Sequence, residues 1–285
     1  MRIGVSVSST GIQSEPSLLL ACVMAAEKAG FADIWMQERM AIAPDDSQSG
    51  GGRCLDPLAA LAWLAGQTHQ IGLGMSALIL PYRPALLTAK TVATIQELSG
   101  NRLRLGVGVG WMESEFRALG VPRKERGKRT DESLAFLNRC FENDRMESHG
   151  QEFLFLPRPQ RPPIYVGGAG DHALRRTVQF ADGWMPMFQF WRNRPDTITP
   201  EELGAQITRL HEMAAEAGRP TPPEVVLGVA FDPKEPQQTV ERMQLIREAG
   251  VNGLVTGAHF ENLDDFRRIL DFLDEHVLSL ENGSA

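Results

Sequence analysis

The stretch that decides the fold is residues 71–109, IGLGMSALILPYRPALLTAKTVATIQELSGNRLRLGVGV. It begins with an apolar run over 71–80 and continues into a helical pattern that opens at Pro84 and stops at Gly100. It ends in a second apolar run over 103–109. Strands that are continuously apolar are typical of parallel sheets covered by helices on both faces. The stretch therefore predicts a strand–helix–strand unit with parallel strands.

The same alternation runs through the rest of the chain. Further strands are expected at 3–7, 33–36, 164–166, 183–185, 225–231 and 253–256, each followed by a helical pattern. One of these helices is expected to be capped by Thr130, with acidic residues in its first turn. Eight strand–helix units are the count of a (β/α)8 TIM barrel, whereas a doubly wound open sheet gives no reason for eight regular units. With no linker or break in composition, we predict one domain over residues 1–285.

Composition narrows the class of partner. The chain has a net charge of −7, with 42% hydrophobic and 23% charged residues, which is ordinary for a globular protein. The acidic balance argues against a nucleic-acid or anionic-membrane partner. The three cysteines are far apart and form no CxxC pair, which fits a reducing compartment. There is no leader pattern and no run of about 20 apolar residues, so we expect a cytoplasmic protein with no membrane segment.

Barrel active sites lie at the C-terminal ends of the strands, which makes the segments after the strands the candidates. After the second strand come Glu38 and Arg39, then a glycine-rich loop over 41–54 that reads equally as a lid or as a surface insertion.

The segment after the fourth strand holds a second set of candidates. Gly108 and Gly110 would let a flat ligand approach the backbone, and Trp111 follows them. Glu113 and Glu115 could pair as acid and base, or could simply be the acids of a helix N-terminus.

The segment after the fifth strand is a candidate phosphate site. Gly167, Gly168, Ala169 and Gly170 precede Asp171, which is expected to cap the next helix. Glycine amides and a helix N-terminus together suit a phosphate group, although tight turns require glycine in any case.

Two further segments border this region. The basic stretch 117–129 is either an anion site or a solvated face, and the aromatic stretch 187–192 is either an apolar pocket or an interface.

The sequence lacks the motifs of several kinds of catalytic and binding site. The six histidines form neither HxH nor HExxH, so no metal site is expected. The chain also contains no GxSxG and no GxxxxGK[ST]. A glycine-rich and aromatic rim without a metal set points to an organic cofactor.

Four segments together resemble the luciferase-like monooxygenase superfamily: AAEKAGFADIWMQER (25–39), residues 80–121, ERGKRTDESLAFL (125–137) and PPIYVGGAGDHALRRTVQFADGWMP (162–186). The resemblance implies a barrel that uses FMN or the deazaflavin coenzyme F420, and the chain looks closest to the F420-dependent groups. It also implies a homodimer, a bulge with a cis peptide at Ser76-Ala77 behind the flavin ring, and a phosphate held at Gly167–Asp171.

Two positions depart from the pattern of that superfamily. An acid–His pair is common after the second strand, and this chain has Glu38-Arg39 there. The catalytic acid of the sugar-phosphate dehydrogenases in the superfamily falls on Trp111, which makes that activity doubtful.

The hypothesis is an oxidoreductase that transfers a hydride or activates oxygen through a bound flavin or deazaflavin, acting on a small organic substrate. The candidate catalytic residues are Glu38, Arg39, Trp111 and Glu113, and the candidate cofactor-binding residues are Ser76, Ala77, Gly108, Gly110 and 167–171. F420 is favoured over FMN because the basic stretch could receive its oligoglutamate tail. The alternatives are a cofactor-free or non-catalytic barrel, and an isomerase or lyase acting on a phosphorylated substrate.

Overall fold

The computed structural model describes residues 1–44, 51–186, 200–257 and 259–281. Within these ranges all eight expected strands are present and form one closed barrel in the order β1-β10-β9-β8-β7-β4-β3-β2. Neighbouring strands are parallel throughout the barrel. The prediction of a (β/α)8 barrel is therefore confirmed. The barrel strands are β1 (Arg2–Val7), β2 (Asp33–Met36), β3 (Gly72–Ile79), β4 (Leu103–Gly108), β7 (Ile164–Gly167), β8 (Gly183–Met185), β9 (Glu224–Ala230) and β10 (Gly253–Gly257).

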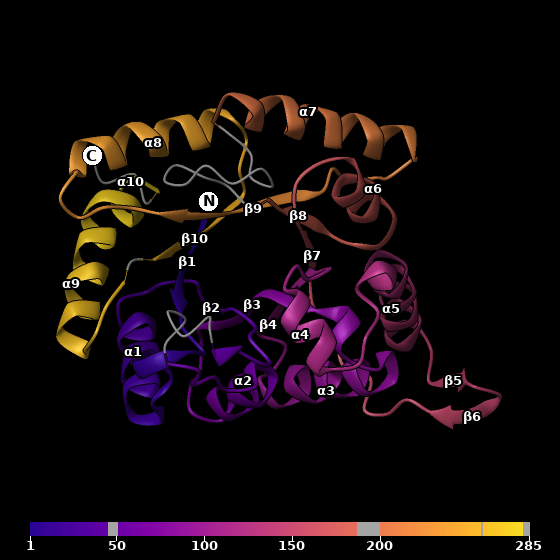
Figure 1. Cartoon of the computed structure of the whole chain (residues 1–285). Coiled ribbons are helices and arrows are strands. Elements are labelled where there is room, and N and C mark those ends of the chain that lie inside the picture. The colour runs from indigo at the N-terminus through magenta and orange to yellow at the C-terminus, as the bar shows by residue number, and fades with distance from the viewer. Residues whose placement is uncertain (45–50, 187–199, 258, 282–285) are drawn as a thin grey trace.

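The helices form a ring around the barrel, with α1, α2 and α3 along one side and α7 and α8 along the opposite side (Figure 1). The N-terminus of α2 is capped by a side chain: Asp56 accepts a hydrogen bond from the Ala59 N–H. The helices are α1 (Pro16–Lys28), α2 (Pro57–Ala65), α3 (Ala85–Leu98), α4 (Glu113–Ala118), α5 (Arg126–Glu142), α6 (Asp171–Phe180), α7 (Pro200–Glu216), α8 (Pro236–Glu248), α9 (Leu263–Leu273) and α10 (Ser279–Glu281).

Two elements differ from the prediction. The helix expected to be capped by Thr130 begins at Arg126, and the Thr130 hydroxyl donates to the Arg126 carbonyl inside α5. A threonine inside a helix commonly bonds back to the preceding turn in this way. The structure also contains an antiparallel hairpin of β5 (Arg145–Ser148) and β6 (Gln151–Leu154), which projects from the ring of helices (Figure 1).

The strands separate two apolar layers, because alternate side chains point to opposite faces. The main core lies between the strands and the helices and includes Ile34 and Met36 of β2. A second cluster fills the barrel interior: Trp35, Tyr165, Met185, Val226 and Val255.

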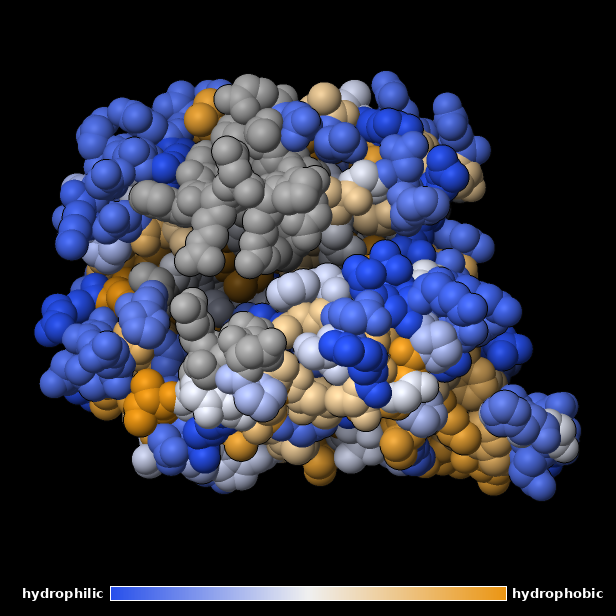
Figure 2. Space-filling view, viewed as in Figure 1, coloured by the Kyte–Doolittle hydropathy of each residue, from blue (hydrophilic) through white to orange (hydrophobic). Residues whose placement is uncertain are grey.

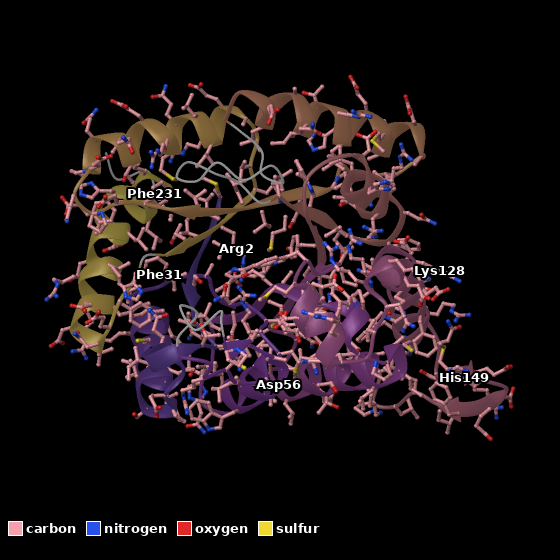
Figure 3. The ribbon with its side chains drawn as sticks, viewed as in Figure 1. Arg2, Phe31, Asp56, Lys128, His149 and Phe231 are labelled. Atoms are coloured by element: carbon pink, nitrogen blue, oxygen red, sulfur yellow. The ribbon has the colours of Figure 1, made fainter. Side chains whose placement is uncertain are left out.

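A charged network lies beside this second cluster, at the N-terminal ends of the strands. Asp33 pairs with Arg2 at 2.7 Å and with Arg104 at 3.1 Å. The Tyr165 hydroxyl links this network to Glu224 at 3.0 Å. Figure 3 shows Arg2 near the middle of the ring of helices. Charged and aromatic side chains therefore occupy most of this end of the barrel, and a cavity of about 70 Å³ remains between them.

Two findings bear on the compartment. Cys22, Cys54 and Cys140 are all free thiols. Within the part of the chain that the structure describes, no helix is both long and apolar enough to cross a bilayer.

Candidate functional site

Small residues line the barrel interior above the second cluster. Gly228 of β9 follows Glu224 and Val226 on the inward face, and a Cβ placed on it would meet no atom within 4 Å. Ser6 of β1 and Gly257 of β10 face each other, since a Cβ on Gly257 would lie 3.0 Å from the Ser6 Cβ. Figure 2 shows that this face of the molecule is hollowed.

One wall of this hollow is an irregularity in β3. The register between β3 and β4 shifts between Met75 and Leu78, and the Ser76-Ala77 peptide is cis, as the resemblance implied. A Cβ on Gly108 would lie 3.5 Å from the Ala77 Cβ, and one on Gly167 would lie 3.8 Å from it. The bulge and these two glycines of neighbouring strands therefore form one surface of small residues, which suits a planar ring.

The local structure requires glycine at position 110, and contact of Gly110 with a cofactor stays a prediction. Its φ is 77°, and a Cβ there would lie 2.7 Å from Ile79 Cγ2 and 3.0 Å from the Phe116 ring. The position requires glycine for its backbone conformation and for packing. It is therefore a structural position beside the site.

Glu38 is buried beneath the rim instead of facing the hollow. Its side chain has no exposed surface, and it accepts hydrogen bonds from the Ile79 N–H at 2.5 Å and from Arg83 at 2.6 Å. Arg83 also pairs with Asp56 at 2.7 Å. Burial raises the pKa of Glu38, and the Arg83 charge opposes this shift. Because Ile79 ends the bulged strand β3, this carboxylate links the end of that strand to Arg83.

Glu115 is similarly buried in α4, after β4, and its contacts were not predicted from the sequence. Its carboxylate accepts from the Met40 N–H at 2.7 Å and from the Tyr82 hydroxyl at 2.8 Å. Burial and this carboxylate raise the pKa of Tyr82. Glu113 lies on the exposed side of α4 and pairs with Arg123 at 3.6 Å. The structure therefore does not bring Glu113 and Glu115 together, because residues i and i+2 of a helix face different directions.

Arg39 lies across the end of β3. Its guanidinium carbon is 5.3 Å from the centre of the Trp111 ring, and one of its N–H groups contacts the Met112 sulfur. Arg39 follows β2, whereas Trp111 and Met112 follow β4, and β3 lies between these two strands in the barrel. The two residues predicted from different loops are thus brought together over the strand that carries the bulge.

The turn after β7 has the geometry of an anion site. Gly168 and Gly170 have φ values of 113° and 80°, which favour glycine. Within the described residues, the N–H groups of Ala169, Gly170, Asp171 and His172 have no acceptor, as is usual at the start of a helix. These donors, together with the N-terminus of α6, suit a phosphate group.

The expected cap at Asp171 is wrong. Gly170 occupies the cap position of α6, and Asp171 is the first helical residue. Its carboxylate binds Arg209 of α7 at 2.8 Å and lies 3.5 Å from Arg175. Asp171 therefore holds two half-exposed arginines beside the glycine turn after β7 and offsets part of their charge.

The basic stretch 117–129 is largely helical. Arg129 pairs with Glu125 at 2.9 Å and Lys128 with Glu132 at 3.7 Å, in addition to the pair formed by Arg123. Figure 3 shows Lys128 on the outer side of α5. Acids within and beside this stretch thus pair with three of its six basic residues.

Some of the predicted features lie outside what the structure describes. Phe188, Phe190 and Trp191 fall outside the described residues, as does part of the glycine-rich loop at 45–50. Within the described residues, no group of His, Cys, Asp and Glu side chains has the arrangement of a metal site.

Known proteins resemble this chain in sequence and in fold. The family model for luciferase-like monooxygenases matches residues 1–276. An uncharacterised protein of Mycobacterium tuberculosis is 31% identical over 252 residues, which cover 82% of each chain. The F420-dependent hydroxymycolic acid dehydrogenase of Mycobacterium tuberculosis is 27% identical over 192 residues, covering 64% of this chain and 52% of that one.

A solved structure shows the same fold at low identity. The oxygenating constituent of 3,6-diketocamphane monooxygenase from Pseudomonas putida, in complex with FMN, superposes with a TM-score of 0.76 at 16% identity, covering 97% of this chain and 98% of that one. The agreement extends over the whole barrel. The chain therefore belongs to the luciferase-like monooxygenase family.

Proposed function

We propose that this chain is an oxidoreductase that binds a flavin or deazaflavin reversibly at the C-terminal end of the barrel. The observation that carries this is the pairing of two features on neighbouring strands. A surface of small residues at Ala77, Gly108 and Gly167 suits a ring, and the amides of 169–172, which have no acceptor among the described residues, suit its phosphate. When bound, such a cofactor would supply hydride transfer or oxygen activation. Membership of the luciferase-like monooxygenase family supports this chemistry.

The residues of the chain would prepare the site for the cofactor. Glu38 would hold the end of β3, and therefore the bulge, against the ring. The amides after β7 would hold the phosphate, and Arg39 and Trp111 would border the substrate side. The apolar cluster in the barrel interior, which includes Trp35 and Tyr165, would keep water from the lower side of the ring.

Of the two cofactors, we propose F420 ahead of FMN. A relative of 27% identity is named for F420, and the unpaired members of the basic stretch 117–129 could receive an oligoglutamate tail. The FMN complex of the diketocamphane monooxygenase supports FMN as the second candidate.

Titration of the purified protein with FMN and with F420 tests this proposal. We expect micromolar binding, seen as a change in cofactor absorbance and fluorescence. The substitution Gly228→Leu should weaken this binding at least tenfold while the far-ultraviolet circular dichroism stays unchanged, because the new side chain enters open space inside the barrel. The smaller Gly228→Ala serves as the graded control. If neither cofactor binds the parent protein, the proposal is lost.

We also propose that the protein is a cytoplasmic homodimer. Trp63 of α2 and Leu87 and Leu98 of α3 are 39%, 63% and 61% exposed, and the two leucines lie on one face of α3. Exposed apolar patches of this kind often mark interfaces. We expect sedimentation velocity to show a dimer, which Leu87→Glu converts to monomer. Leu245→Glu on α8, where the leucine is 53% exposed, should leave the dimer intact. A monomeric parent protein would contradict the expectation.

A further inference from the structure

The cation of Arg39 has no acidic partner among the described residues. It contacts the Trp111 ring and the Met112 sulfur, neither of which carries charge. A guanidinium has five N–H donors and stays protonated, so it retains donors for an anionic group. Arg39 itself is only partly buried, and the end of β3 lies beside it.

The acids nearest to Arg39 in the fold are committed elsewhere. Glu38 is bonded to Ile79 and Arg83, and Glu115 is bonded to Met40 and Tyr82. Both carboxylates are buried on the inner side of the rim loops and hold those loops together. Neither offsets the charge of Arg39 through an ion pair, so the rim carries a positive group beside the ring site.

We propose that Arg39, stacked on Trp111, is a specificity-determining residue that selects a substrate bearing a carboxylate. A planar guanidinium binds a carboxylate through two parallel hydrogen bonds, and the indole ring holds the guanidinium in a fixed plane. This inference rests on the proposed function, because it identifies the substrate class for the same site.

The position of Arg39 separates this role from phosphate binding. Arg39 follows β2, and the phosphate turn follows β7, with β3 and β4 between these strands in the barrel. The phosphate turn has its own amide donors and its own arginines, Arg175 and Arg209. An anion at Arg39 is therefore a second anion, which the substrate would supply.

Calorimetric titration with matched acids and amides tests the proposal without a turnover assay. The probes are benzoate and benzamide, phenylacetate and phenylacetamide, and hexanoate and hexanamide, each with the protein alone and with the protein saturated by cofactor. We expect at least one acid to bind tenfold or more tightly than its amide. The preference should be flat from pH 6 to pH 9, because neither the guanidinium nor the carboxylate titrates there.

Variants test whether Arg39 causes the preference for acids over amides. Arg39→Gln should reduce the acid preference to within about twofold, whereas Arg268→Gln, which removes a charge from an exposed ion pair on α9, should leave it unchanged. Arg39→Lys should keep part of the preference, because the charge remains and the planar fork is lost. Equal binding of acids and amides, failure of every acid to bind, or an unchanged preference in Arg39→Gln would each overturn the proposal.

The measurements of cofactor binding separate this inference from the proposed function. If Arg39→Gln weakens cofactor binding and leaves the acid preference in place, the arginine belongs to the cofactor site and the inference fails. If no cofactor binds the parent protein, the proposed function fails, and the acid-to-amide ratio of the protein alone still decides the role of Arg39.

Discussion

Replacing Glu38 by alanine is expected to lower the free energy of unfolding by about 3 kcal/mol, because it leaves Arg83 part-buried without this partner and the Ile79 N–H without an acceptor. Removing one member of a buried ion pair costs about 3–5 kcal/mol, and the remaining Asp56 contact of Arg83 places this case at the low end. Urea unfolding followed by circular dichroism measures the change.

The matched control is Glu113→Ala, which removes an exposed carboxylate from the same rim. Exposed ion pairs contribute about 0–1 kcal/mol, so this variant should stay close to the parent protein. Equal stabilities of the two variants would contradict a positioning role for Glu38.

The isosteric variant Glu38→Gln separates positioning from proton transfer. The amide oxygen can still accept from the Ile79 N–H while the charge is lost, so stability should fall and cofactor affinity should change with it. A proton-transfer role instead predicts loss of kcat with stability and cofactor affinity unchanged.

The second large effect is expected at Gly106 in β4. An alanine Cβ there would lie 2.2 Å from the Met75 backbone oxygen and 3.1 Å from the Met185 sulfur. The neighbouring strand is held by its ladder and cannot move away without losing hydrogen bonds. We expect Gly106→Ala to lower the free energy of unfolding by about 3 kcal/mol, near the upper end of typical overpacking costs.

Gly228→Ala provides the control, since it is the same substitution on an inward face of the barrel. Its Cβ would meet no atom within 4 Å, so the stability should change by less than about 1 kcal/mol. The two urea transitions are compared directly. A Gly106→Ala protein as stable as the Gly228→Ala protein would show that the barrel interior is wider at β4 than the structure shows.

The eight strands were predictable because each is a local pattern. The run at 71–80 is apolar on both faces, and β2 was predicted with the bounds Asp33–Met36 that it has. The hairpin β5–β6 was missed because much of its sequence, RMESHGQEFL over 145–154, is charged or polar and carries little apolar alternation.

Parts of the site were also predictable from position in the chain. The bulge at Ser76-Ala77 and the glycine turn after β7 lie where the resemblance implied. The sequence also carries a signal for the position of Ser6. Ile3, Val5 and Val7 are buried on one side of β1, and this alternation places Ser6 on the inward face.

The sequence by itself determined the barrel, the end that carries the site and the segments that border it, because strand and helix periods are local and strand ends fix where loops meet. Only the tertiary structure decided what each polar group does. Glu38 and Glu115 look equivalent to Glu113 in the sequence, yet the first two are buried among backbone amides and the third is exposed. Contacts such as that of Arg39 with Trp111 join segments about 70 residues apart, and only barrel closure brings such groups together.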